Sequence, residues 1–199
     1  MKKRPNIVVI AGPNGAGKST TASRLLHGAL SVSEFVNADD IAASLSPNNP
    51  EKTAIQASRL MLKRLEALTQ KRKDFAFETT LSARGFPRRI AGLIKTGYIF
   101  RLIFLWLPSP DMAKARVKLR VRTGGHDVPE DVIERRYHSG LRNFFEYYQP
   151  MALDWRFYDN SGPESPRLIA LGNSITKDQT VYDHETWAHI TRAYAMNIK

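Results

Sequence analysis

Short apolar runs recur along the chain, and most of them end at polar or small residues. The first run, residues 6–11, is continuous and rich in β-branched residues, which is typical of a buried strand in a parallel sheet. We expect further strands at residues 35–37, 75–77 and 98–107, with two shorter ones at 155–158 and 167–170. The pattern predicts a sheet of about five strands.

Segments with apolar residues at helical spacing lie between these runs. We expect helices at residues 18–30, 51–70, 83–96, 109–123, 127–148 and 183–196. Asn49-Pro50 is a helix start, with Asn as the cap and Pro at the first helical position, and Gly97 is a stop signal. Asp127 and Glu130 have the spacing of a capping box. Strands that alternate with helices predict an α/β fold, a three-layer sandwich around a mostly parallel sheet.

The length and the apolar runs bound the class of protein. A chain of 199 residues suits one compact domain, residues 1–199, with its own core. The run at residues 7–11 is too short for a signal segment, and the run at 98–107 contains Arg101 and is too short to span a bilayer. We therefore expect a cytoplasmic protein that does not contact a membrane. There is no cysteine, which excludes disulfides, thiolate catalysis and cysteine-based zinc sites.

The chain is strongly basic, with a formal net charge of +11. Basic residues spread over solvated faces explain such a charge without any ligand. The charge also suits an anionic ligand, such as a nucleotide together with a phosphorylated co-substrate. Net charge alone leaves nucleic acid open as a partner.

Residues 12–19 read Gly-Pro-Asn-Gly-Ala-Gly-Lys-Ser, the full pattern of a phosphate-binding loop, or P-loop. The loop follows a predicted strand and precedes a predicted helix, which is the context that this motif requires. Its glycines let backbone N–H groups turn toward phosphate oxygens, and the helix N-terminus adds partial positive charge. Lys18 reaches the β- and γ-phosphates, and the Ser19 hydroxyl coordinates Mg²⁺. The motif predicts that ATP and Mg²⁺ bind at Gly12, Asn14, Gly15, Ala16, Gly17, Lys18, Ser19 and Thr20.

Polar side chains follow the second and third predicted strands. Asp39 and Asp40 come after the second, and Glu78 and Thr80 after the third. Because ligands of open α/β sheets bind at the carboxyl ends of the strands, we expect these residues beside the phosphate loop. Phosphoryl transfer to a hydroxyl needs a base, and Asp39 or Asp40 suits that role.

Each of these carboxylates also has a simpler explanation. One aspartate of the pair is a plausible cap for the helix expected near Ile41. Glu78 either holds an acceptor hydroxyl or a magnesium-bound water, or is an exposed strand end.

Arginine-rich segments flank the pair Gly124-Gly125. The basic residues before it are Arg116, Lys118, Arg120 and Arg122, and those after it are Arg135 and Arg136. Two basic helices joined by a glycine hinge suit a lid, over about residues 112–140, that excludes water and brings arginines to the transferring phosphoryl group. Arg116 and Arg120 are four residues apart and share a helix face, whereas Arg122 lies on another side. The simpler reading is a solvated basic helix.

Taken in order, these motifs resemble the zeta-toxin family of P-loop kinases. The resemblance is carried by residues 12–20, 37–42, 77–82 and 124–129, by Arg135-Arg136, and by residues 159–161. It covers residues 6 to about 161. It implies a kinase that phosphorylates UDP-N-acetylglucosamine or another sugar nucleotide on a sugar hydroxyl, and an antitoxin protein as partner.

The resemblance also implies roles for individual residues. Asp39 matches the catalytic base and Lys18 the loop lysine. Arg120 and Arg135 best match the two lid arginines at the phosphates, with Arg122 and Arg136 as the alternatives. Asp40, Glu78, Thr80 and Arg136 are assigned to the acceptor side, and Arg122 and Asn160 to the nucleotide side. The lid sequence Gly-Gly-His-Asp-Val-Pro and the short chain depart from the well-known toxins, so the acceptor is expected only to be a small anionic molecule.

Two other functions stay compatible with the sequence. A nucleic-acid-directed P-loop kinase would bind RNA or DNA with an affinity that falls steeply with salt. A non-catalytic ATP-dependent switch would bind ATP and form no phosphorylated product.

Overall fold

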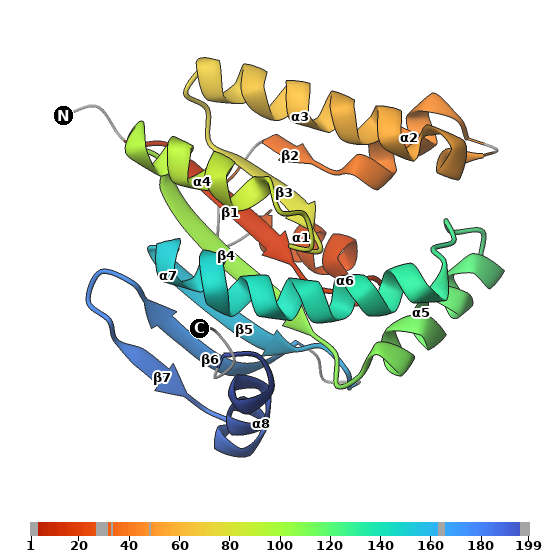
Figure 1. Cartoon of the computed structure of the whole chain (residues 1–199). Helices are drawn as coiled ribbons and strands as arrows, with labels where there is room; N and C mark the ends of the chain where they lie inside the picture. The colour runs from red at the N-terminus through yellow and green to blue at the C-terminus, as the bar shows by residue number, and fades with distance from the viewer. Residues whose placement is uncertain (1–3, 27–31, 33, 48, 163–165, 196–199) are drawn as a thin grey trace.

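The computed structural model describes residues 4–26, 32, 34–47, 49–162 and 166–195. In this part of the chain seven strands form one sheet, in the order β2-β3-β1-β4-β5-β6-β7 (Figure 1). The strands are β1 (Asn6–Ala11), β2 (Glu34–Val36), β3 (Phe75–Thr79), β4 (Ile99–Trp106), β5 (Asp154–Asp159), β6 (Arg167–Asn173) and β7 (Gln179–Val181). The first five strands of that order pair in parallel, and β6 and β7 extend the edge in antiparallel fashion. The prediction of an α/β fold with a mostly parallel sheet is confirmed, but the sheet has seven strands rather than about five. The sequence pattern does not predict β7, which is short and largely exposed.

Helices connect the strands and pack around the sheet. They are α1 (Lys18–Leu26), α2 (Ala38–Leu45), α3 (Ala54–Gln70), α4 (Phe86–Lys95), α5 (Pro110–Arg122), α6 (Glu130–Asn143), α7 (Gln149–Met151) and α8 (His184–Tyr194). In Figure 1, α4 and α6 cross in front of the sheet and α3 lies beyond the β2 edge. The predicted extension of α1 to residue 30 falls outside the described residues.

Two predicted helix starts differ from the structure. The first begins at Pro50 as predicted, but its first turn, Pro50–Thr53, is a 3₁₀ turn, and α3 itself begins only at Ala54. The capping box at Asp127 does not form, because α6 begins at Glu130 after the extended residue Pro129. The Asp127 carboxylate instead accepts a hydrogen bond from the adjacent Val128 N–H at 2.8 Å. After Asn143 the helix continues as a π-helical turn, Phe144–Tyr148, into α7.

Aromatic side chains form much of the core between the sheet and the end of α6. Phe104 of β4 stacks on Phe157 of β5 with ring centroids 4.9 Å apart, and Phe144 packs edge-on against both rings. Trp155 stacks on Trp187 of α8 at 5.5 Å, which joins α8 to the same cluster. The π-helical turn places Phe144, Phe145 and Tyr148 in the core.

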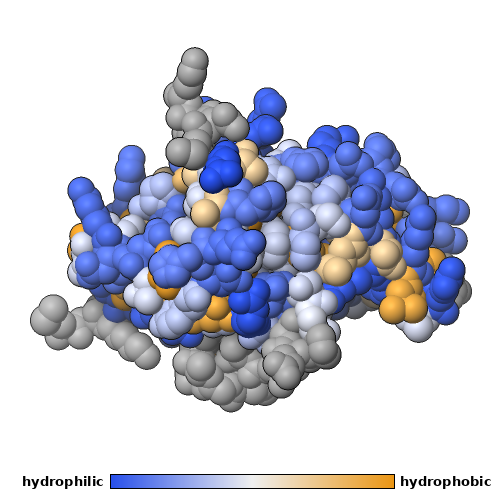
Figure 2. Space-filling model, turned by 90° about the horizontal axis from the view of Figure 1, so that it is seen from below, coloured by the Kyte–Doolittle hydropathy of each residue, from blue (hydrophilic) through white to orange (hydrophobic). Residues whose placement is uncertain are grey.

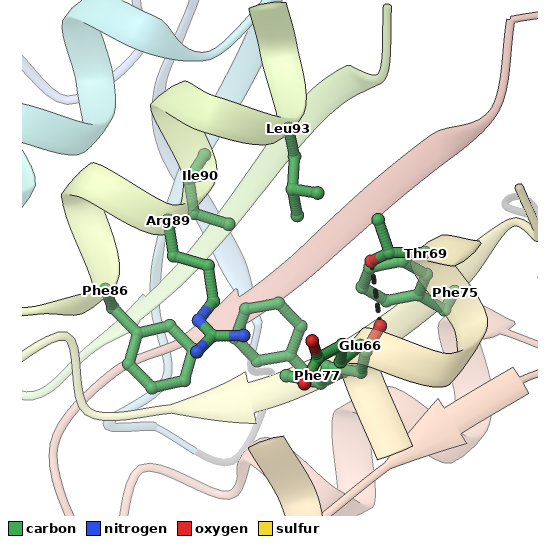
Figure 3. Close-up of a pocket in the computed structure, with 9 residues that line it drawn as sticks. Glu66, Thr69, Phe75, Phe77, Phe86, Arg89, Ile90 and Leu93 are labelled. Atoms are coloured by element: carbon green, nitrogen blue, oxygen red, sulfur yellow. Dashed lines mark hydrogen bonds between the residues drawn. The ribbon is translucent and has the colours of Figure 1, made fainter. Parts of the chain in front are cut away.

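An apolar cavity of about 190 Å³ lies between α3 and α4. Figure 3 shows Phe86 and Arg89 of α4 reaching toward Phe77 of β3, and the Phe77 and Phe86 ring centroids are 5.6 Å apart. The lining consists of Leu65, Glu66, Thr69, Phe75, Phe77, Phe86, Arg89, Ile90 and Leu93. The buried residues of α4 are Pro87 and Ile90.

The face of the molecule in Figure 2 is largely hydrophilic. Viewed from below Figure 1, apolar residues lie in small scattered groups among polar ones (Figure 2). Two of the most exposed apolar side chains, Ile55 and Ile175, are single residues far apart in the sequence. Within the described ranges, no helix is both long and apolar enough to cross a membrane.

The Tyr148 hydroxyl is buried, and no group in the described part of the chain hydrogen-bonds it. A buried hydroxyl without a partner loses its hydration and gains nothing. We expect Tyr148→Phe to leave the free energy of unfolding unchanged or to raise it by about 1 kcal/mol in urea denaturation.

The matched control is Tyr137→Phe, because the Tyr137 hydroxyl donates to the Leu107 carbonyl at 2.7 Å. This control should lower the free energy of unfolding by about 1 kcal/mol. Equal losses in the two variants would show that the Tyr148 hydroxyl has a partner.

Candidate active site

The loop between β1 and α1 has the backbone that phosphate binding requires. Gly12, Gly15 and Gly17 all have positive φ, at +145°, +76° and +73°. A Cβ atom on Gly12 would lie 2.2 Å from the Leu105 carbonyl oxygen of β4, so only glycine fits there. The loop therefore packs closely against the end of β4. Its backbone N–H groups come directly before the first turn of α1.

Lys18 lies where charged groups from four other elements meet. Its ammonium donates a hydrogen bond to the Pro13 carbonyl at 2.9 Å, so it lies across the loop. Burial lowers the pKa of Lys18, while the charges of Glu78 and Asp39 raise it and those of Arg120 and Arg136 lower it further. These partners come from β3, α2, α5 and α6. The structure therefore gathers around the loop lysine four residues that the sequence assigns to the site.

Asn37 organises the two carboxylate segments. It caps α2, since its side-chain oxygen accepts from the Asp39 N–H at 2.9 Å. Its amide group donates to Glu78 at 2.6 Å. Asp39 and Asp40 lie in the first turn of the helix. The alternative that one aspartate caps this helix is therefore wrong, because Asn37 takes that place and leaves both carboxylates exposed to solvent.

Glu78 is a buried carboxylate, with 9% of its surface exposed. Burial raises the pKa of Glu78, whereas the charge of Lys18 and a hydrogen bond with the Ser19 side chain lower it. Asp39 and Asp40 raise it further. The alternative that Glu78 is an exposed strand end is wrong, since it lies within reach of the loop lysine and the loop serine.

Two arginines, Arg120 of α5 and Arg136 of α6, lie close enough to Lys18 to lower its pKa. Arg136 is half-buried and interacts with the charge of Asp39, whereas its neighbour Arg135 is exposed. Arg120 donates to the His126 carbonyl at 2.6 Å, and its buried Nε atom has no hydrogen-bond partner within the described ranges. Such an orphaned donor suits an anion.

Two other basic residues of α5, Lys118 and Arg122, are not among the charges that act on Lys18. Lys118 pairs with Glu130 at 2.6 Å. Exposed Arg122 lines a groove with residues of α5 and α6, among them Val117 and Ile133. Arg122 and Arg135 are thus less well placed than Arg120 and Arg136 to meet a phosphate at the loop.

Asn160, which follows β5, also contacts the phosphate loop. Its amide donates to the Ala16 carbonyl at 2.7 Å, and a Cβ atom on Gly17 would lie 2.9 Å from it. Arg116 donates from both guanidinium nitrogens to the carbonyls of Asn160 and Ser161, at 2.7 and 2.8 Å. The sequence shows Arg116 as one of several lid arginines, but not that it fixes the Asn160 segment against the loop.

A short turn after β3 completes the site. The hydroxyl oxygens of Thr80 and Ser82 are 2.8 Å apart, and the turn contacts α6 at Gly140 and Asn143. The sequence pattern does not single out either α6 residue, because their partners are about sixty positions away and no local pattern records the contact.

The raised pKa of Glu78 has a consequence for stability. A carboxyl group whose pKa is higher in the folded than in the unfolded chain favours folding below its ordinary pKa of 4.5 and loses that contribution as the pH rises. We expect Glu78→Gln to gain unfolding free energy relative to the wild type as the pH rises from about 4.5 to 8. Urea denaturation at several pH values measures this difference, with exposed Glu66→Gln as the control. A difference that does not change with pH would contradict the prediction.

The chain has relatives by sequence and by structure. Residues 7–144, well over half of the chain, match a family described as AAA domain. An uncharacterized protein of Haemophilus influenzae is 29% identical over 130 residues, which cover 65% of this chain and 91% of that protein.

Solved structures with the same fold include AvrRxo1-ORF1:AvrRxo1-ORF2 with sulphate ions. Its TM-score is 0.72 at 16% identity, over 94% of this chain and 64% of that one. The PezAT chromosomal toxin-antitoxin system of Streptococcus pneumoniae has a TM-score of 0.64 at 13% identity, over 100% and 81% of the two chains. The Pnkp1/Rnl/Hen1 RNA repair complex has a TM-score of 0.55 at 18% identity, over 70% and 45%.

This chain therefore spans slightly less than two thirds of the AvrRxo1 chain that it matches. The structural similarities, all at low identity, show a shared fold. Together with the phosphate loop and the match over residues 7–144, they lead to the conclusion that this chain is a P-loop protein belonging to the AAA domain family.

Proposed function

We propose that this protein is an ATP-dependent kinase that transfers the γ-phosphate to a hydroxyl group of a small anionic acceptor. The observation that carries the proposal is the convergence on Lys18 of two carboxylates and two arginines from four different elements. Phosphoryl transfer needs cations around the transferred group and a base near the acceptor hydroxyl. A structure described as AvrRxo1-ORF1:-ORF2 with ATP, which has a TM-score of 0.71, supports ATP as the donor.

Each residue has a proposed role. Asp39, exposed in the first turn of α2, takes the proton of the acceptor hydroxyl. Lys18, Arg120 and Arg136 stabilise the negative charge on the phosphoryl oxygens. The segment around Asn160 lies on the adenine side of the loop.

Ser19 and Glu78 fit a magnesium ion that accompanies the nucleotide. They present a hydroxyl and a carboxylate that interact with each other beside the loop, and Mg²⁺ prefers such oxygen donors together with substrate phosphates. When bound by these residues, Mg²⁺ would neutralise part of the negative charge of the phosphates.

On the acceptor side we assign Asp40, Thr80 and Arg136, beside the base. The charge of Arg136 near Asp39 favours an anionic acceptor. The resemblance to zeta toxins makes UDP-N-acetylglucosamine the first acceptor to test. The structural similarity to PezAT, at low identity, supports only the fold. The acceptor therefore stays part of the proposal.

The lid region of about residues 112–140 and an antitoxin partner belong to the same proposal. Two of the structural neighbours are described as toxin-antitoxin or two-protein complexes. If the kinase is a toxin, expression in a bacterial host should arrest growth and the Lys18→Ala variant should not.

The transfer reaction is tested by mass spectrometry with ATP, Mg²⁺ and UDP-N-acetylglucosamine, beside a metabolite extract. The wild type should add one phosphate to an acceptor, and Lys18→Ala should add none. Asp39→Asn should still bind ATP but lose transfer by about a hundredfold or more. Full turnover in Asp39→Asn would refute its role as the base, and no phosphorylated small molecule in any reaction would refute the small-molecule kinase.

A nucleic-acid-directed kinase is the second candidate, favoured by the net charge of +11 and by the fold shared with part of the RNA repair complex. It predicts phosphate transfer to an oligonucleotide and binding that weakens steeply with salt. The same mass-spectrometry assay with RNA and DNA oligonucleotides separates the two candidates.

Arg135 and Arg136 form a matched pair that tests which lid arginine meets the phosphates. Because Arg136 is half-buried beside Asp39 and Arg135 is exposed, Arg136→Ala should lower kcat by about a hundredfold or more. Arg135→Ala should change kcat by less than about threefold. The reverse order in steady-state kinetics would assign the role to Arg135, as the sequence motif alone suggests.

A further inference from the structure

The turn after β3 contains a backbone conformation that its residue rarely adopts. Leu81 has φ of +58°, in the left-handed region that non-glycine residues generally avoid. Its side chain is fully buried, so glycine could not replace it without loss of core packing. Unfavourable backbone geometry of this kind persists only where surrounding contacts enforce it, and it is concentrated at functional sites.

Hydrogen bonds on both sides of Leu81 enforce this conformation. The Asn143 amide, at the end of α6, donates to the Leu81 carbonyl at 2.7 Å, and both groups are buried. The Leu81 N–H donates to the Thr79 hydroxyl at 3.1 Å. Both backbone polar groups of Leu81 therefore have partners in the observed conformation, and one of them is a side chain sixty-two positions away.

Gly140 lets α6 approach the same turn closely. A Cβ atom at Gly140 would lie 2.3 Å from the Thr80 carbonyl oxygen. Glycine in the middle of a helix weakens that helix relative to alanine. The close approach to the turn accounts for a glycine at this position, and this observation is independent of the Asn143 hydrogen bond.

Arg136, Gly140 and Asn143 lie on one face of α6, because successive separations of four and three residues return to the same side of a helix. The first interacts with the charge of Asp39, and the other two contact the turn. Tyr137 fixes the same helix to the end of β4 through the Leu107 carbonyl. One rigid element thus carries the proposed lid arginine and also supports the turn that follows Glu78.

We propose that Asn143 and Gly140 are positioning residues for the acceptor. They hold the turn of Thr80, Leu81 and Ser82, which follows Glu78, so that the paired hydroxyls of Thr80 and Ser82 bind the hydroxylated acceptor. The proposal rests on the proposed kinase function for its acceptor side, but the support of the turn by α6 has a readout of its own.

Two variants remove the support in different ways. Asn143→Leu keeps a similar side-chain size and lacks the donor, and Gly140→Ala improves helix propensity while forcing the turn away. Arg142→Ala, at an exposed position between them, is the matched control. Ile190→Ala, in the buried face of α8, is the control for a general loss of stability.

The first measurement is amide hydrogen exchange of the intact protein. In Asn143→Leu and Gly140→Ala, exchange of residues 79–83 should be faster by about tenfold or more. In Arg142→Ala it should equal the wild type, and in Ile190→Ala any increase should not be confined to this segment. Unchanged exchange of residues 79–83 in both turn variants would overturn the proposal.

The second measurement is steady-state kinetics with the acceptor that the wild type phosphorylates. In the two turn variants the KM for the acceptor should rise by about tenfold or more, and the KM for ATP should change by less than about twofold. Equal increases in both KM values, matched by Ile190→Ala, would mean a structural role only and would also overturn the proposal. If the wild type phosphorylates nothing, the kinase proposal fails, and hydrogen exchange alone then decides whether α6 holds the turn.

Discussion

The parallel pairing of β1 with β3 and β4 is the constraint on which the candidate site depends. Ala11, the last residue of β1, is in register with Thr79 of β3 and Phe104 of β4. Because parallel strands end at the same edge, the segments that follow β1 and β3 leave the sheet at one level, and β4 continues beside them to Trp106. The phosphate loop, Glu78 and the segment after β4 are therefore neighbours, and Gly12 fits against the Leu105 carbonyl only because it has no side chain.

The electrostatics of the site follow from this crowding. A partly buried ammonium is unfavourable by itself, and the nearby carboxylates of Glu78 and Asp39 offset part of that cost. Glu78 is in turn buried, hydrogen-bonded by Asn37 and close to the charge of Lys18. Groups that oppose folding in this way are typical of functional sites, where the surrounding structure supplies the missing stability.

Helix α6 connects the parts of the site that come from distant segments. Its inward face touches the end of β4 through Tyr137 and the turn after β3 through Gly140 and Asn143. The π-helical turn that follows anchors its end by three buried aromatic residues. If α5 and α6 move as a lid, the turn after β3 has to move with them or exchange its contacts, so lid position and acceptor geometry are linked by packing.

Elements whose signal is local can be predicted from the amino-acid sequence. Continuous apolar runs marked the buried parallel strands, and the glycine-rich loop between strand and helix identified the P-loop, because both depend on neighbouring residues. Local signals were less reliable where a competing bond was available. Asn37 rather than an aspartate caps α2, and Asp127 bonds the next N–H rather than capping α6.

Which side chains meet in the site depends on how the helices and strands pack. The motif favours Arg135 over its neighbour Arg136, but the rotation of α6 turns Arg136 toward Asp39 and leaves Arg135 in solvent. The contacts of Arg116 with Asn160 and of Asn143 with Leu81 join positions forty-four and sixty-two residues apart. Such contacts depend on how packed helices are placed over the sheet, and periodicity along one segment carries no record of that placement.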